Sequence, residues 1–263
     1  MLKTFADETN RDAKDMVFVM VGWTANVREW DEFAKSWRAC LAEKPSIQYY
    51  KTSEANSLSG QFHTFNDEAG MEAKREALAR VIASYKLNGY FTEISHKAFS
   101  QKPQRLRKLM GTRIYDWAFI DMVCGVLEDC LERGNPFEVI DFTFDGCPEL
   151  RACIGSYEGI REHFPLSMRA IAGEAIPGDD KRLAGLQAAD LLAGGISAHL
   201  KGQAQQFFRI IVDARRIVRL RPYLPPQLHL LFQYANQVYG RTELAHKTVK
   251  LLKERGIDLD DLK

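Results

Sequence analysis

Two aspartates stand at the ends of predicted β-strands, where a sheet displays reactive groups. Asp7 follows the apolar residues of the run FADET, and Asp145 closes the strand-like run EVIDFTFD. Asp also favours turns, so each residue could instead cap the turn that follows its strand. The pair is a candidate for catalysis or metal binding, with turn capping as the structural alternative.

Asp190 lies in a predicted helix that is otherwise rich in Leu, Ala and Gly, in the run GLQAADLLAGG. Burying an unpaired charge is costly, so we expect its carboxylate at the rim of the packed face. Gln187, one turn earlier, gives that face a second polar group. The alternative is a carboxylate that points to water. The apolar stripe beside Asp190 consists of Leu186, Ala189, Ala193 and Ile196.

Glu54, in KTSEA, is a further candidate, and its alternative is an ordinary loop acid. Carboxylate oxygens are hard ligands that suit Mg²⁺ or Mn²⁺. Two such ions, roughly 3.5 to 4 Å apart, can activate a water and stabilise the departing oxygen when a phosphodiester is cleaved. The sequence lacks G-x-S-x-G, H-E-x-x-H and a glycine-rich phosphate loop, the usual signs of other hydrolytic sites. The acids therefore favour metal-dependent phosphodiester chemistry.

The elements that position these acids alternate between strand and helix. Apolar and β-branched runs predict the strands, and helical spacing of apolar residues predicts the helices. Strands followed by alternating helices and strands favour an α/β fold, a mixed sheet flanked by helices. The predicted strands cover 2–7, 17–25, 47–51, 90–94, 138–145 and 168–172, and the predicted helices cover 30–41, 72–86, 103–133, 149–163 and 182–200.

Composition narrows the class of protein. The 263 residues are 46% hydrophobic and carry a net charge of +1, so the chain can fill a large core but has no overall attraction to nucleic acid. The five cysteines lack C-x-x-C spacing, which fits a reducing cytoplasm. We expect a cytoplasmic protein with no membrane interaction, because the sequence shows neither a signal core nor a long apolar run.

Pro225 and Pro226 separate a second region from the main domain. We expect a domain over 1–222 and a helical C-terminal extension over 223–263, with helices near 227–239 and 243–255. Apolar residues in the extension could pack internally or form a homo-oligomer.

The sequence resembles the domain-of-unknown-function family 3800, whose members have ribonuclease H-like folds. The similarity covers roughly residues 3–199, and Thr9 stands where the family usually has serine. It implies a ribonuclease H-like domain with Asp7, Glu54, Asp145 and Asp190 as the metal ligands. The matching runs are FADET, GWTANVREWDEF, KTSEA, FTFDG and DDKRLAGLQAADLLAG.

Basic residues form two clusters that could follow a phosphate backbone. The first lies between Glu93 and Asp116, the second follows residue 214, and Lys181 is a further candidate contact. The alternative is a solvated helix face or pairing with acids. The proposed contacts are Lys181, Arg105, Arg107, Lys108, Arg215 and Arg216.

Taken together, these features predict a Mg²⁺- or Mn²⁺-dependent nuclease that hydrolyses DNA or RNA, with defence against foreign nucleic acid as one role. Two alternatives stay open. One is a non-catalytic nucleic-acid-binding or scaffold protein with the same fold, and the other is a nucleotide phosphohydrolase.

Overall fold

The computed structural model describes residues 1–10, 17–65, 67–101, 113–134, 138–162 and 164–220. Its strands are β1 (Leu2–Thr9), β2 (Val17–Asn26), β3 (Asn88–Ser95), β4 (Ile140–Asp145), β5 (Ala172–Gly178) and β6 (Ile217–Arg219). They form one sheet in the order β5-β4-β1-β2-β3-β6. β2 is antiparallel to both of its neighbours, β1 and β3. The other three pairings, β1 with β4, β4 with β5 and β3 with β6, are parallel.

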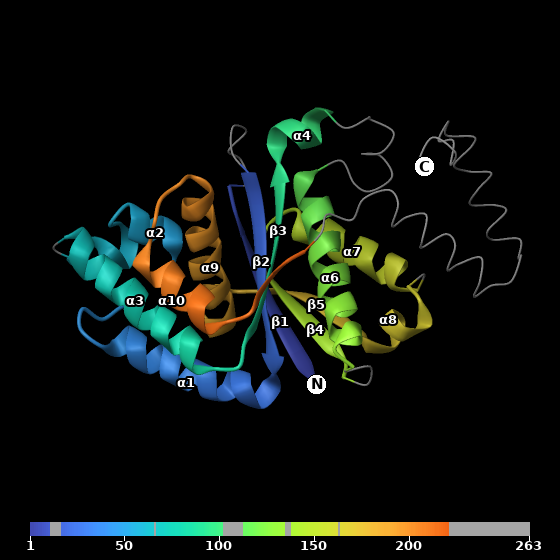
Figure 1. Cartoon of the computed structure of the whole chain (residues 1–263), viewed down its shortest axis with the longest axis horizontal. Helices are drawn as coiled ribbons and strands as arrows, with labels where there is room; N and C mark the ends of the chain where they lie inside the picture. The colour runs from blue at the N-terminus through green and yellow to red at the C-terminus, as the bar shows by residue number, and fades with distance from the viewer. Residues whose placement is uncertain (11–16, 66, 102–112, 135–137, 163, 221–263) are drawn as a thin grey trace, which may run out of the picture.

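Helices cover both faces of this sheet (Figure 1). One face carries α1 (Val27–Ala42), α2 (Thr52–Asn56), α3 (Glu68–Ser84), α9 (Ala184–Leu200) and α10 (Gln206–Ala214). The other carries α6 (Ile114–Glu132), α7 (Leu150–Arg161) and α8 (Leu166–Ile171), while α4 (His96–Gln101) follows β3 and the short 3-10 helix η1 (Gly60–Thr64) follows α2. This confirms the predicted α/β fold, a mixed sheet flanked by helices.

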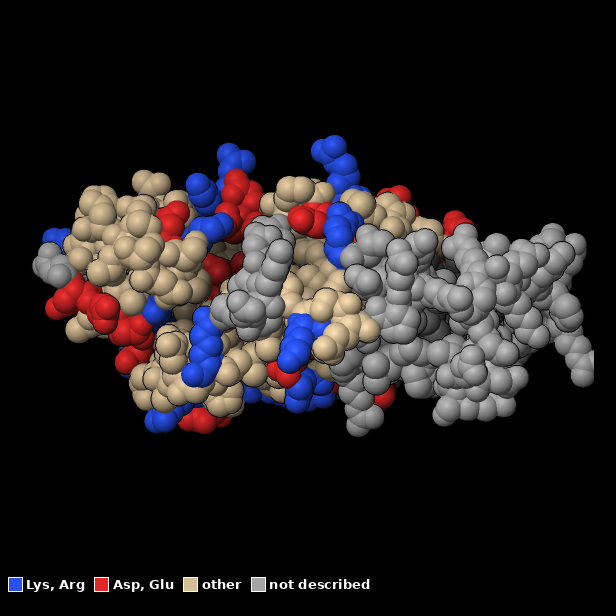
Figure 2. Space-filling view, turned by 90° about the horizontal axis from the view of Figure 1, so that it is seen from above, with Lys and Arg blue, Asp and Glu red and all other residues tan. Residues whose placement is uncertain are grey.

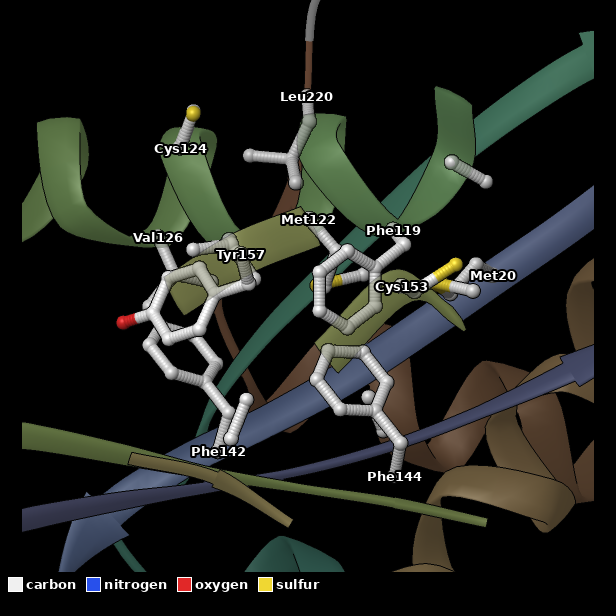
Figure 3. Packing of buried hydrophobic residues seen from close by; sticks show 14 of the residues in the cluster. Met20, Phe119, Met122, Cys124, Val126, Phe142, Phe144, Cys153, Tyr157 and Leu220 are labelled. Atoms are coloured by element: carbon white, nitrogen blue, oxygen red, sulfur yellow. The ribbon is translucent and has the colours of Figure 1, made fainter. Parts of the chain in front are cut away.

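Each face of the sheet has its own hydrophobic core, because successive strand side chains point to opposite faces. In β2, Phe18 and Met20 join the core under α6, whereas Val19 and Trp23 join the core under α9. Under α6, aromatic rings from helix and strand pack directly, with the Phe119 and Phe144 centroids 4.6 Å apart (Figure 3). The sheet is therefore fixed from both sides.

The helix α1 shows why the sequence pattern predicts its position well. The Asn26 side chain accepts a hydrogen bond from the Glu29 backbone N–H at 2.8 Å, which caps the first turn. The predicted aromatic stripe is buried, and it places the Trp37 indole N–H 2.8 Å from Oε1 of Gln187 on α9. Packing on the sheet and a polar bond to a neighbouring helix thus both hold α1.

Two predicted strands are wrong. The segment 47–51 is irregular and leads into α2. Its Ile47 and Tyr50 are buried by side-chain packing, and the Tyr50 backbone N–H donates to Gln187 instead of to a neighbouring strand. The segment 168–172 belongs mainly to helix α8, and the strand β5 begins at Ala172. A short apolar run cannot by itself distinguish a strand from a buried helix or loop.

Other boundaries fall partly outside the described residues. The predicted helix 103–133 corresponds to α6 where the structure describes it, and the helical extension 223–263 lies outside the described residues. The hydrophobic pattern of the sequence does not predict α10 or β6. No helix in the described part of the chain is long and apolar enough to cross a membrane.

Candidate functional site

Asp7 and Asp145 lie side by side near the carboxyl ends of the neighbouring strands β1 and β4. β1 and β4 are parallel, and their register pairs Ala6 with Phe144, the residues immediately before the two aspartates. Ala6 and Phe144 both point into the core under α6, so strand alternation directs both aspartates to the face covered by α9. Figure 2 looks onto this end of the molecule, where acidic side chains gather in a hollow near the middle. The sheet topology therefore brings together two acids that are far apart in sequence.

Asp190 reaches the same place from α9. Its Oδ2 accepts a hydrogen bond from the Thr52 backbone N–H at 2.6 Å, and its backbone oxygen accepts one from the Thr52 hydroxyl at 3.0 Å. A Cβ at Gly194, one turn along the helix, would lie 2.7 Å from Thr52. The glycine lets α2 approach α9 closely, so these contacts fix both the Asp190 carboxylate and the start of α2.

The site holds more negative charge than a buried location tolerates without compensation. Asp7 is only 7% exposed. Burial, and then the carboxylates of Asp190, Glu8 and Asp145, raise its pKa well above the ordinary value, while a 2.7 Å hydrogen bond from the Glu8 backbone N–H opposes the rise. Burial is also the main cause that raises the pKa of Asp190 to about 6, against the hydrogen bonds from Thr52. Asp190 and Asp145 are thus both close enough to Asp7 to repel its charge.

Asp180 belongs to the same cluster, although it is not among the site residues predicted from the sequence. It is 9% exposed and forms an ion pair with Lys51. After burial, the Asp180 charge is the largest cause that raises the pKa of Asp145, and Lys51 lowers it. The signal available in the sequence is the Gly-Asp-Asp run, 178–180, just before α9. Lys51 therefore partly neutralises the cluster from within the protein.

Gln187 has a positioning role rather than a place among the acids. Its Oε1 accepts hydrogen bonds from Trp37 at 2.8 Å and from the Tyr50 backbone N–H at 3.1 Å. Its amide nitrogen donates to the Asp180 backbone oxygen at 2.8 Å. One buried amide thus holds α1, the segment before Lys51, and the turn that carries Asp180.

Glu54 is directed elsewhere. Its Oε1 accepts a hydrogen bond from the Tyr49 hydroxyl at 3.0 Å, and its Oε2 accepts one from the Gln61 backbone N–H at 3.3 Å. Gly60 has a positive φ of 56°, and a Cβ there would lie 2.0 Å from Oε2, so the turn closes tightly over the carboxylate. These contacts hold Glu54 in its own loop, and the structure shows no contact with the three aspartates among the described residues. Part of the expected four-acid set is therefore not assembled.

The cluster matches a hard divalent cation in the type and charge of its oxygen donors, but the spacing of those donors does not match one. Clustered carboxylates with raised pKa values are stabilised by an added positive charge. Within the described ranges, however, no three His, Cys, Asp or Glu side chains converge closely enough to hold a metal ion. Asp7, Asp145 and Asp190 thus fit a cation by donor type and charge, and their side chains would have to draw together around it.

The described basic candidates lie in intramolecular contacts. The Lys181 ammonium is 5.2 Å from the centre of the Tyr49 ring. Arg215 donates to the Ala83 backbone oxygen, and Arg216 makes two hydrogen bonds to Asp129 at 3.0 and 2.6 Å. Both arginines stand next to β6, which pairs with the first half of β3, at the end of the sheet opposite the aspartates. Arg105, Arg107 and Lys108 lie outside the described residues.

No family model and no curated protein matches the chain. Among solved structures, it is similar to a chain of the PCNA:RNase HII complex from Archaeoglobus fulgidus, with a TM-score of 0.40 and 12% sequence identity. The similarity covers 100% of this chain and 94% of that chain. A TM-score of 0.40 gives the similarity no weight for function, which has to come from the chain's own residues.

Proposed function

We propose that the protein is a divalent-metal-dependent nuclease of the ribonuclease H type, related to the domain-of-unknown-function family 3800, that hydrolyses phosphodiesters in DNA or RNA. The observation that carries this proposal is the meeting of Asp7, Asp145 and Asp190 at the carboxyl ends of β1 and β4, where the charges of Asp190 and Asp145 raise the pKa of Asp7. Buried carboxylates whose repulsion lowers the stability of the protein are typical of functional sites.

In this proposal Asp7, Asp145 and Asp190 hold Mg²⁺ or Mn²⁺. The bound ions would supply activation of a water and stabilisation of the departing oxygen. Asp7 is the central ligand because it is the least exposed of the three and its pKa is raised by the charges of both of the others. Thr52 orients the Asp190 carboxylate through its backbone N–H. Lys51 supplies a fixed positive charge beside Asp145 and Asp190.

A cleavage assay tests the proposal. The purified full chain is incubated with labelled single- and double-stranded DNA and RNA in Mn²⁺, in Mg²⁺ and in a chelator, alongside free nucleotides. We expect metal-dependent cleavage of a polymer. Asp7→Asn and Asp190→Asn should each reduce the rate by roughly a thousandfold, about 4 kcal/mol in the activation free energy, because a metal ligand is lost.

The matched control is Asp31→Asn, which changes an exposed aspartate on α1 and should leave the rate unchanged. Cleavage that survives Asp7→Asn would contradict the proposed site. Binding of nucleic acid without cleavage in any metal would favour a scaffold, and hydrolysis of free nucleotides alone would favour a phosphohydrolase.

A further inference from the structure

A cavity of about 450 Å³ adjoins the aspartate site. It lies among the end of β1, α2, α3, α9 and the segment before α10. Thr52 lines it and also donates its backbone N–H to Asp190. Thr9, two residues beyond Asp7, lines it too. A ligand in this α2–α9 cavity would therefore contact the residue that is hydrogen-bonded to Asp190 and a residue two positions beyond Asp7.

The lining of the cavity is close to neutral, unlike the aspartate site. The acids Glu68 and Glu72 are matched by the cations Arg75 and Lys201. A site for a phosphate group would carry a net positive charge, so this lining favours an uncharged part of a ligand.

The remaining lining residues combine hydrogen-bonding amides with apolar surface. The amides of Asn56 and Gln203 can both donate and accept, and Met71 and Phe207 supply apolar surface. Flat heterocycles with donors and acceptors on their edges, such as nucleobases, need both kinds of contact. The volume also falls within the range of roughly 300 to 1,000 Å³ that is usual for small-molecule sites.

The walls of the cavity are fixed by internal contacts. Arg75 is 3% exposed, and it donates to the Tyr50 hydroxyl at 3.1 Å, to Glu72 at 2.6 Å and to the Asn56 side chain. On the other side, the Asn10 side chain donates to the Ser197 hydroxyl at 2.9 Å and ties the end of β1 to α9. A site held in this way loses little conformational entropy when a ligand enters.

We propose that the α2–α9 cavity binds the base and sugar of one unpaired nucleotide in a strand whose neighbouring phosphate lies at the aspartates. This inference rests on the proposed function and narrows its substrate to strands with an unpaired nucleotide. A base inside a cavity cannot stay paired in a duplex, so single-stranded DNA or RNA should bind better than the matched duplex.

The first test follows the methyl groups of the methionines by NMR in the wild-type chain, with a chelator present so that no metal contributes. Met71 lines the cavity, whereas Met168 is buried to the same 5% exposure in the core on the other face of the sheet. We expect a saturable shift of the Met71 signal with a short single-stranded oligonucleotide. A nucleoside monophosphate should produce a weaker shift of the same signal, and inorganic phosphate should produce none.

The second test fills the cavity. Ala198 lines it from α9 and is 6% exposed, and Ala198→Leu should weaken binding of the single strand roughly tenfold by occupying part of the space. The control is Ala170→Leu on α8, an exposed position on the other face of the sheet. An unshifted Met71 signal at saturation, or equal affinity of Ala198→Leu and the wild type, would overturn the inference. A shift with mononucleotides but not with strands would overturn its assignment to a strand.

The two proposals can fail separately. A shifted Met71 signal without metal-dependent cleavage would support the nucleotide site and contradict the nuclease activity. If cleavage is lost in Asp7→Asn but the Met71 signal does not shift, the result would support the nuclease activity and contradict the nucleotide site.

Discussion

The two ends of the sheet each bury an aspartate to the same extent, in opposite surroundings. Asp129, on α6, and Asp7, on β1, are both 7% exposed. Asp129 accepts hydrogen bonds from the Tyr90 hydroxyl at 2.7 Å and from Arg216 at 2.6 Å, and it pairs with Arg133 at 2.7 Å. Asp7 accepts the Glu8 backbone N–H and faces other carboxylates.

This difference separates structural acids from candidate functional ones. Removing a charge from water costs several kcal/mol unless partners inside the protein compensate it. The protein supplies those partners for Asp129 from α6, β3 and the segment before β6. At Asp7 the nearby groups increase the cost, so compensation has to come from a bound cation or proton. Burial alone does not identify a site, and the charge of the surroundings does.

The largest expected difference between the two ends is in stability. Asp129→Ala should lower the free energy of unfolding by about 3 kcal/mol, because Tyr90 and two arginines lose their partner. Asp7→Asn should leave the metal-free protein as stable or more stable by ~1 kcal/mol, because a repelled charge is removed. Urea unfolding in a chelator measures both. Equal destabilisation by the two variants would remove the distinction between the ends.

The pH dependence of stability sharpens the comparison. The pKa of Asp190 is raised to about 6, above its unfolded value of about 3.9. A raised pKa means that the native state holds the proton more tightly, so this contribution is present at about pH 4 and is lost as the pH rises through about 6.

The metal-free wild type should therefore lose about 2 kcal/mol relative to Asp190→Asn between about pH 4 and pH 7. Saturating Mn²⁺ should reduce that loss, because the bound ion compensates the ionised carboxylates. Urea unfolding of both proteins across this range measures the effect, and a loss unchanged by Mn²⁺ would contradict metal binding at Asp190.

Lys51 offers a smaller test, because it supplies part of the missing positive charge. Lys51→Met should tighten Mn²⁺ binding about fivefold, or ~1 kcal/mol, since the Lys51 ammonium would no longer compete with Mn²⁺ for the negative charge of the carboxylates. Calorimetric titration measures the affinity. The control is Lys35→Met, which removes a lysine that pairs with Glu32 on the surface of α1. Weaker Mn²⁺ binding in Lys51→Met would mean that the ion does not bind at these carboxylates.

The smallest effect is expected at Glu54. Its carboxylate is held by Tyr49 and Gln61 in a separate loop. Glu54→Gln should therefore change Mn²⁺ affinity less than about twofold, within ~0.4 kcal/mol, whereas Asp145→Asn should weaken it strongly. Parallel titrations of the two variants test this. A large effect of Glu54→Gln would restore it as a ligand and imply that the loop rearranges when metal binds.

The sequence predicts the elements whose periodicity is long or strongly apolar. The strands β1, β2, β3 and β4 and the helices α1, α3 and α9 lie close to their predicted positions. Short runs fail for a physical reason, because burial of Ile47 and Tyr50 or of Met168 looks the same in sequence whether a strand, a helix or a loop buries them.

The sequence by itself determined that Asp7 and Asp145 lie near the ends of strands and that Asp190 belongs to an apolar helix. Only the tertiary structure decided that these three meet, that Asp180 and Lys51 join them, and that Glu54 and Arg216 are engaged elsewhere. The reason is that periodicity fixes which face of an element a side chain occupies. The partner across from that face depends on strand order and loop closure, which join residues more than a hundred positions apart.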